Sequence, residues 1–198
     1  MSKFLLILGP SGVGKSSIIH NLCERDQRFV YISPYITRPL REGEKDKISI
    51  TDAEMDHMDA SDKLLAINRL YGIRYATPRV PIAEALDAGQ FPILDWPISK
   101  LKVMSQAFPK LHIVYIAPPS LETLTERLSR DERGGNSSRL QMAIEEFRLY
   151  QEDDQFTAAC DLTVVSHEGE IEAIAGQIYA HYLAAVAMQS KQSETFHK

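Results

Sequence analysis

The chain has few of the residues that mark secreted or membrane proteins. Its 198 residues include only two cysteines, Cys23 and Cys160, which match neither a disulfide framework nor a metal-binding spacing. We therefore expect two buried thiols in a reducing compartment. No apolar run approaches the ~20 residues of a membrane span, and a strand pattern stands where a signal peptide would begin. These absences predict a cytoplasmic protein without a membrane partner.

Excess positive charge is also missing. The formal net charge is −5, which argues against a nucleic-acid partner because such proteins carry a basic surface. The six histidines show no pairing and no ligand spacing, so we interpret all of them as structural or exposed. With 44% hydrophobic and 25% charged residues, the composition is that of a globular domain.

A phosphate-binding motif stands near the start of the chain. Residues 9–16 read G-P-S-G-V-G-K-S, between the apolar run 4–8 and a helical pattern that begins near Ser17. Such a turn directs backbone N–H groups and a helix N-terminus at a nucleotide polyphosphate. We expect Lys15 to reach the β- and γ-phosphates and the Ser16 hydroxyl to ligate Mg²⁺. The expected nucleotide-binding residues are Gly9, Pro10, Ser11, Gly12, Val13, Gly14, Lys15, Ser16 and Ser17.

Strand and helix patterns alternate along most of the chain. Apolar strands are predicted at residues 3–8, 29–33, 91–95, 111–117 and 161–165, and helices at 16–25, 79–88, 99–108, 120–128, 138–156 and 169–188. This order predicts an α/β fold with an open parallel five-stranded sheet that is flanked by helices. We expect a core of residues 1–33 and 80–188 and a flexible tail at 189–198.

Two segments interrupt the alternation. Residues 34–79 are rich in charge and turn formers, which indicates an inserted subdomain. Within it, Thr51 and Glu54 have the spacing of a helix capping box, and Met55 and Met58 are expected to face inward. Residues 130–138 combine consecutive charges with Gly-Gly-Asn, which is typical of a mobile loop.

Four further segments resemble the guanylate kinase family. They are T-R-x-x-R-x-G-E at 37–44, Y-G-I-R-Y-A-T at 71–77, I-L-D at 93–95, and I-A-P-P-S at 116–120 followed by Leu124, Arg127 and Leu128. They occur in family order, and the resemblance covers about residues 3–185. It implies a P-loop nucleoside monophosphate kinase fold with an acceptor-binding subdomain and a lid at 130–138. It also implies transfer of the γ-phosphate of ATP, with Mg²⁺, to the phosphate of a small-molecule acceptor, by family default GMP.

The resemblance assigns roles to residues outside the phosphate loop. Acceptor-binding residues would be Arg38, Arg41, Glu44, Tyr75 and Thr77, and Asp95 would hold Mg²⁺ together with Ser16. Arg38 and Arg41 are three residues apart, so their guanidinium groups are able to converge on one phosphate. Catalysis would rest on Lys15, Arg38, Arg130 and Arg139, and the role of Arg133 stays open.

The chain departs from the family where guanine is read. The two guanine-reading carboxylates of the family fall here at about Ala66 and at Pro97, and neither side chain accepts a hydrogen bond. Each missing partner costs ~1–3 kcal/mol, which predicts weakened guanine preference. A tyrosine that contacts the acceptor phosphate is also missing, because the segment after Glu44 is shorter.

Two alternatives follow from these departures. The ribose 1,5-bisphosphate phosphokinases also resemble this chain in the Y-I-T-R and L-L-A segments, and Arg69 and Arg74 would suit an acceptor with an additional phosphate. The other alternative is a catalytically silent guanylate-kinase-like binding module. The intact Lys15 and Ser16 argue against it, because a scaffold has no need for a phosphate-loop lysine.

Overall fold

The computed structural model describes residues 4–70, 72–108, 110–130 and 136–195. The strands are β1 (Phe4–Leu8), β2 (Phe29–Tyr31), β3 (Tyr35–Ile36), β4 (Ile48–Ser49), β5 (Leu64–Leu70), β6 (Ile73–Pro78), β7 (Phe91–Asp95), β8 (Leu111–Ala117) and β9 (Leu162–Val165). The helices are α1 (Lys15–Arg25), α2 (Asp52–Ala60), α3 (Val80–Asp87), α4 (Leu101–Ala107), α5 (Leu121–Ser129), α6 (Asn136–Glu152), α7 (Asp154–Ala159) and α8 (Ile171–Thr195). A short 3₁₀ turn, η1 (Ile98–Lys100), precedes α4.

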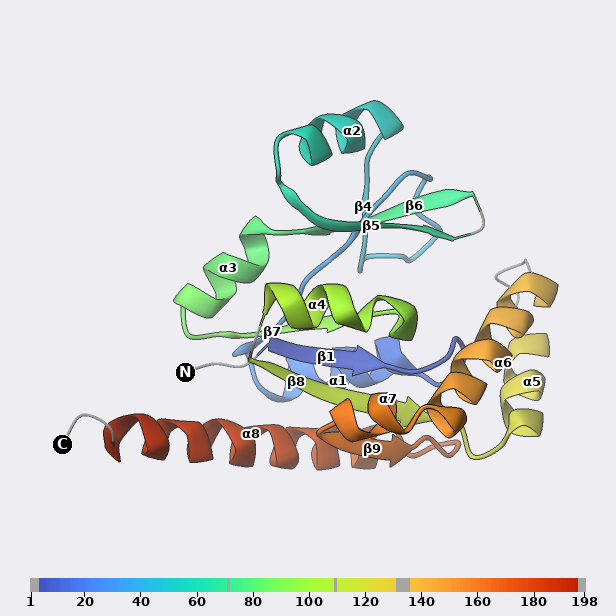
Figure 1. The fold of residues 1–198 in the computed structure, drawn as a ribbon. Coiled ribbons are helices and arrows are strands. Elements are labelled where there is room, and N and C mark those ends of the chain that lie inside the picture. The colour runs from blue at the N-terminus through green and yellow to red at the C-terminus, as the bar shows by residue number, and fades with distance from the viewer. Residues whose placement is uncertain (1–3, 71, 109, 131–135, 196–198) are drawn as a thin grey trace.

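The larger sheet has five parallel strands in the order β2-β7-β1-β8-β9. Its central strand β1 is buried along its whole length, as its unbroken apolar sequence predicts. Helices lie on both faces of the sheet (Figure 1). The predicted α/β class and the five-stranded parallel sheet are therefore confirmed. β1 leads directly into residues 9–14, at the carboxyl edge where ligands bind in open parallel sheets.

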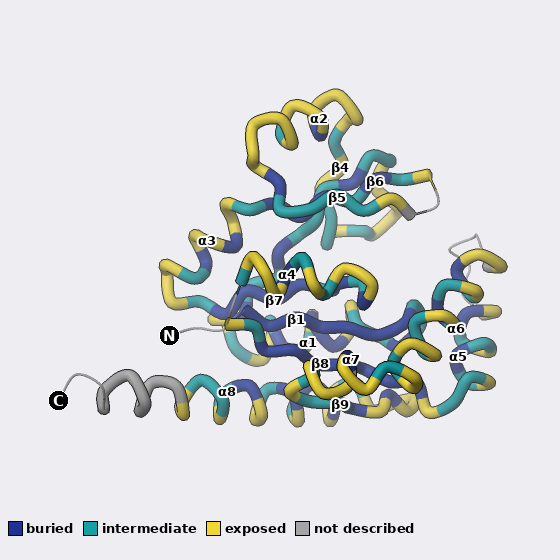
Figure 2. Tube along the Cα trace, viewed as in Figure 1, coloured by how far each residue is buried: buried dark blue, intermediate teal, exposed yellow. Residues whose placement is uncertain are grey.

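Two apolar clusters fill the two sides of this sheet. On one side, Leu5 and Ile7 of β1 pack with buried residues of α1, α5, α6 and α8. On the other, Phe4, Leu6 and Leu8 pack with buried residues of α3, α4 and α7. This division follows from the alternation of side chains along a strand. Figure 2 shows the buried strands between the half-exposed helices.

A smaller sheet of four strands, in the order β4-β3-β6-β5, stands above the larger one (Figure 1). The sequence pattern of this region was too weak to predict these strands. Helix α2 covers the small sheet through Met55, which is fully buried, while Met58 is partly buried. Thr51 accepts a hydrogen bond from the backbone of Glu54, and Glu54 accepts one from the backbone of Thr51. The capping box and the inward-facing methionines are thus confirmed.

The helix that we predicted at 138–156 is two helices. Asp153 separates α6 from α7, and its carboxylate accepts hydrogen bonds from the backbone N–H groups of Gln155 and Phe156. This is N-cap geometry, which turns the chain where the apolar pattern alone suggests continuity. The last helix also differs from the prediction, because α8 continues beyond Met188 to Thr195.

Two histidines form a contact that the sequence does not indicate, and the two cysteines are less buried than expected. The Nε2 atom of His112, which is fully buried on β8, lies 3.1 Å from Nδ1 of His181 on α8. A buried His112 and an exposed His181 agree with the interpretation of the histidines as structural or exposed, but their contact, across 69 positions, has no signal in the sequence. Cys23 and Cys160 are free thiols that are only partly buried. Within the described ranges, no helix is long and apolar enough to cross a membrane.

Candidate active site

The phosphate loop connects β1 to α1 through residues with positive φ. Gly9, Gly12 and Gly14 have φ values of 140°, 91° and 88°, a region that only glycine enters readily. A Cβ on Gly9 would lie 2.4 Å from the carbonyl oxygen of Ile116 on β8. Glycine is therefore required at this position for both conformation and space.

The N-terminus of α1 is open to an anion. Gly14 supplies no side-chain cap, and no acidic residue stands in the first turn. The first backbone N–H groups of a helix have no intrahelical acceptor, so they are left for a ligand. The Lys15 ammonium group lies on the loop, where it donates to the carbonyl oxygens of Gly9 at 2.6 Å and Pro10 at 3.1 Å. Backbone donors, an uncapped helix and a lysine together fit the phosphates of ATP.

Two segments that are distant in sequence contribute to this loop. Arg139, in the first turn of α6, donates to the Ser11 hydroxyl at 3.0 Å. Glu146, two turns further along α6, is partly buried, and burial raises the pKa of its carboxyl while the charge of Lys15 opposes that effect. Helix α6 therefore brings one cation to the phosphate loop, and one carboxyl that interacts electrostatically with Lys15.

Asp95 ends β7 beside this loop. Its backbone pairs with Ile7 of β1, and its Oδ1 atom accepts a hydrogen bond from the Tyr31 hydroxyl at 3.0 Å. Burial, followed by the negative charge of Asp95, raises the pKa of Tyr31, so this hydroxyl stays a donor. Asp95 and Ser16 both line the cavity next to the loop. A carboxylate and a hydroxyl are the oxygen ligands that Mg²⁺ uses in phosphate-binding sites.

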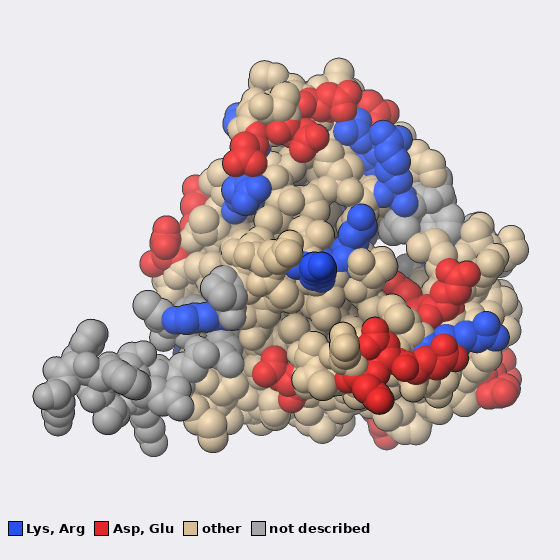
Figure 3. All heavy atoms as spheres, viewed as in Figure 1, with Lys and Arg blue, Asp and Glu red and all other residues tan. Residues whose placement is uncertain are grey.

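A cavity of about 770 Å³ extends from the phosphate loop to the small sheet. Ser11, Ser16 and Arg139 line its loop end, and Arg38, Arg41, Glu44 and Tyr75 line the other side. The cavity thus brings together nine of the residues predicted from the sequence: Ser11, Ser16, Arg38, Arg41, Glu44, Tyr75, Thr77, Asp95 and Arg139. On the face of the molecule shown in Figure 3, acidic and basic side chains are interspersed.

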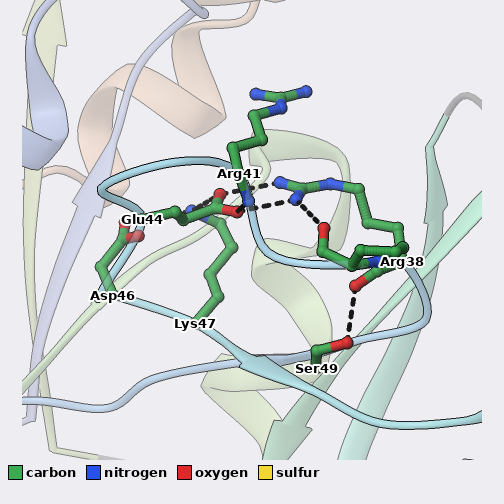
Figure 4. A network of polar contacts seen from close by, with 7 residues as sticks. Arg38, Arg41, Glu44, Asp46, Lys47 and Ser49 are labelled. Atoms are coloured by element: carbon green, nitrogen blue, oxygen red, sulfur yellow. Dashed lines mark hydrogen bonds and ion pairs between the residues drawn. The ribbon is translucent and has the colours of Figure 1, made fainter.

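Arg38 is held by Glu44 (Figure 4). Its two terminal nitrogens donate to the two carboxylate oxygens of Glu44, each at 2.7 Å. Both side chains are mostly buried, and the hydrogen bonds from Arg38 lower the pKa of the Glu44 carboxyl to about 2. Lys47 lies 3.3 Å from the same carboxylate, whereas the Arg41 side chain extends away from the pair. The two arginines therefore differ, because Arg38 is already oriented and Arg41 is exposed.

The remaining end of the cavity is neutral. Asn68 on β5 lies directly opposite Tyr75 on β6, and Ala66 lies opposite Thr77. Asn68, Tyr75 and Thr77 line the cavity, together with Pro97. Ala66 packs against the apolar cluster that also contains β1 residues. The positions where the family carries guanine-reading carboxylates thus hold only apolar side chains in this structure.

Two further arginines named by the sequence analysis, Arg130 and Arg74, do not line this cavity. Arg130 is exposed at the end of α5, 3.7 Å from Glu126, and is not among the residues that line the cavity. Arg74 projects to the opposite side of β6, where it pairs with Asp52 at 3.1 Å and Asp56 at 2.6 Å. Arg133 lies outside the described residues, as does most of the predicted lid.

Sequence reasoning missed three residues at this site, Tyr31, Asn68 and Trp96, and also Glu146, which interacts with Lys15 from outside the cavity. Tyr31 and Glu146 act through contacts between distant segments, and no motif marks them. Trp96 follows the I-L-D segment, and its buried indole N–H has no acceptor among the described residues. The position of Asn68 could have been predicted from the sequence. Residues two apart on a strand share a face, and the sequence analysis had already placed Ala66 at the acceptor site.

Comparison with known proteins agrees with this site. The family model for guanylate kinase matches residues 1–178. A guanylate kinase of Carboxydothermus hydrogenoformans is 34% identical over 180 residues, which cover 83% of this chain and 88% of that protein. One of Thermobifida fusca is 35% identical over 130 residues, which cover 64% of this chain and 66% of the relative.

A solved guanylate kinase structure resembles this chain in its fold. The crystal structure of guanylate kinase from Anaplasma phagocytophilum superposes with a TM-score of 0.69 and covers 93% of this chain and 86% of that one. At 21% identity this likeness concerns the fold alone. Together with the match to the family model, it shows that the chain belongs to the guanylate kinase family of phosphotransferases.

Proposed function

We propose that the protein transfers the γ-phosphate of ATP to the phosphate of GMP. The observation that carries this proposal is the single cavity with the phosphate loop at one end and Arg38, Arg41 and Tyr75 at the other. Transfer between two phosphates requires two anions to approach in line, and cations must offset the charge that develops. The named guanylate kinase relatives support the choice of GMP.

On the donor side, the first turn of α1 and Lys15 would hold the phosphates of ATP. Ser16 and Asp95 would hold Mg²⁺, which supplies charge neutralisation between the phosphates when it is bound. Tyr31 keeps Asp95 oriented toward that position through its hydrogen bond of 3.0 Å. Arg139 is tied to Ser11 of the loop, so it is available to the γ-phosphate without a large movement.

On the acceptor side, Arg38 and Arg41 would bind the phosphate of GMP. Arg38 is oriented by Glu44, and Ser49 fixes the backbone at this point by donating to the Arg38 carbonyl oxygen at 2.7 Å. The guanidinium of Arg41 has no partner among the described residues and is ready to meet an incoming anion. The Tyr75 hydroxyl is a third donor on the same side of the cavity.

The domain division also belongs to this proposal. We assign residues 34–79 to an acceptor-binding subdomain, residues 1–33 and 80–188 to the core, and residues 130–138 to a lid. The separate small sheet and its own apolar cluster around Met55 support the first boundary. The cytoplasmic location stays a prediction of the sequence.

Neither of the two alternatives, a ribose 1,5-bisphosphate phosphokinase or a silent binding module, is favoured over transfer to GMP. Ribose 1,5-bisphosphate would need further cations in the cavity, but Arg74 is already paired with two aspartates on the other side of its strand. A silent binding module would not need the Lys15 and Ser16 pair or the Arg139 contact to the loop.

A coupled assay of ADP release tests the proposal. We expect release that depends on ATP, Mg²⁺ and GMP together, and that disappears in Lys15→Ala. Lys102→Ala is the matched control, because Lys102 is exposed on α4, away from the cavity. Absence of ADP release with GMP, in protein that is shown to be folded by circular dichroism, would contradict the proposed function.

A further inference from the structure

Asn68 is the polar side chain at the neutral end of the cavity that the proposed function leaves without a role. It lies on β5 two residues after Ala66, so both side chains are on the same face of the strand, ~7 Å apart. In the small sheet it stands opposite Tyr75, one of the proposed acceptor-binding residues. Its position beside the acceptor site follows from the strand register alone.

The amide of Asn68 is incompletely hydrogen-bonded. Its Oδ1 atom is buried, and no described residue donates to it. A buried carbonyl oxygen without a donor is unfavourable, and native structures rarely keep one except where a ligand or water completes it. Because other atoms of Asn68 line the cavity, a rotation of its side chain would turn the amide toward an N–H group of a bound acceptor and complete this oxygen.

The chemistry around Asn68 narrows the class of acceptor. On the side of the phosphate loop, Thr77 offers a hydroxyl and Pro97 and Ile73 offer apolar surface. The charged side chains near Asn68, among them Arg69, Lys100 and Glu146, line a second pocket that Asn68 and Pro97 also border. An apolar wall with an amide and a hydroxyl suits a flat, uncharged ring that carries both donors and acceptors at its edge. A nucleobase has these properties, whereas a second phosphate does not.

An amide differs from a carboxylate because it donates hydrogen bonds as well as accepting them. A carboxylate only accepts hydrogen bonds, so it favours the N1–H and amino group of guanine and repels the N1 acceptor of adenine. An asparagine that rotates by half a turn about its last torsion exchanges its oxygen for its NH₂ group. It therefore matches the edge of either purine.

We propose that Asn68 reads the base of the acceptor and that, because it is an amide, the protein accepts adenine as well as guanine nucleoside monophosphates. This inference rests on the proposed function in taking a nucleoside monophosphate as the acceptor. Asn68 is a specificity-determining residue in this proposal.

Three variants test this inference. Asn68→Asp keeps the shape and removes the donor, Asn68→Leu keeps the size and removes both polar groups, and Asn21→Asp makes the same amide-to-carboxylate change on α1. Asn21 is a matched control because its Oδ1 atom is also buried without a donor among the described residues, although it does not line the cavity. Dissociation constants for GMP and AMP are measured by calorimetry, and kcat/KM for both by ADP release.

We expect the wild type to prefer GMP over AMP by no more than about tenfold, since an amide pairs with either edge. Asn68→Asp should raise that preference about tenfold or more by rejecting AMP. Asn68→Leu should weaken binding of both nucleotides about tenfold, which is the effect of one lost hydrogen bond. Asn21→Asp should leave the ratio unchanged.

The two proposals fail in different ways. The inference is overturned if Asn68→Asp leaves the GMP-to-AMP ratio unchanged, or if Asn68→Leu binds both nucleotides as the wild type does. If neither nucleotide is phosphorylated but the dissociation constants follow the expected pattern, Asn68 reads the base and the proposed function is wrong. Thermal unfolding of each variant separates loss of recognition from loss of fold, and Asn68→Leu keeps the test valid if Asn68→Asp does not fold.

Discussion

The two ends of the cavity are built differently. The phosphate loop consists of consecutive residues, and its function depends on backbone N–H groups and on glycine conformations at Gly9, Gly12 and Gly14. The base end is assembled from side chains on β5, on β6 and in the turn after β7. A backbone site requires fixed residue types, whereas a side-chain site changes its specificity with one substitution. This difference explains how one end keeps its family motif while the other departs from it.

Charge separates the same two regions. Lys15, Arg38, Arg41 and Arg139 lie around the phosphate positions, where developing negative charge needs cations. The base end around Asn68 and Thr77 has neutral polar groups. We therefore expect substitutions near the phosphates to affect turnover and substitutions near the base to affect selectivity.

Lys15→Ala should have the largest effect. Loss of a group that contacts the transferred phosphate costs about 10²–10³-fold in kcat, as for other preorganised charge-stabilising groups. The fold should be intact, because the ammonium of Lys15 bonds only to its own loop. Steady-state ADP release checks the rate, and circular dichroism checks the fold. Retained transfer in this variant would refute the assignment of the phosphate loop.

Arg38→Ala should cause the second-largest loss of activity. It removes the proposed phosphate ligand and leaves the mostly buried Glu44 without its partner, so acceptor KM should rise and kcat should fall, together about 10²-fold in kcat/KM. Arg28→Ala is a matched control, since Arg28 also pairs with a carboxylate, that of Asp26, but outside the cavity. Unchanged acceptor KM and kcat would show that the acceptor binds elsewhere.

Arg130 and Arg139, at the two ends of the segment 130–139, should differ from each other. Arg139 contacts Ser11, so Arg139→Ala should lower kcat/KM for ATP about tenfold or more, as expected for a lost charge-assisted hydrogen bond. Arg130 is exposed beside Glu126, so Arg130→Ala should have the smaller effect. Initial rates at varied ATP compare the two. An equal loss in both variants would show that Arg130 reaches the phosphates during turnover.

The smallest expected effect is on the pH dependence of the free energy of unfolding, through the Arg38–Glu44 pair. The pKa of Glu44 is about 2 in the folded protein and near 4.5 ordinarily, so the pair stabilises the fold above pH 4.5. This contribution is lost as the pH falls from 4.5 toward 2. Between pH 7 and pH 3 the wild type should lose on the order of 1 kcal/mol more unfolding free energy than Glu44→Gln, since solvent screens part of the pair. Denaturant unfolding at both pH values measures the difference. Equal losses would show that Glu44 is not stabilised by Arg38.

The core could be predicted from the sequence because its signals are local. The apolar residues of β1 and the glycines that follow specify a strand and a phosphate loop without reference to the rest of the chain. The break between α6 and α7 was missed because Asp153 acts as a cap only in the folded geometry. Strands β3 and β4 of the small sheet have two residues each, which is too few for a periodic pattern.

Part of the site depended on contacts that no linear pattern contains. Tyr31 and Asp95 are 64 residues apart, and Arg139 and Ser11 are 128 residues apart, yet each pair is joined by a hydrogen bond. The arginines at 38 and 41 were predicted to act alike, but Glu44 has engaged only the first. Such contacts arise from packing, so sequence analysis names the participants and the structure supplies the pairing.

The most direct test of the central claim is a panel of acceptors in one ADP-release assay. The panel contains GMP, dGMP, AMP, UMP and ribose 1,5-bisphosphate, and kcat/KM is measured for each. An intact phosphate site beside an altered base site predicts transfer to GMP, with AMP within about tenfold of it and ribose 1,5-bisphosphate inactive. Transfer to GMP at micromolar KM with AMP excluded, or no transfer to any purine nucleotide, would contradict this account.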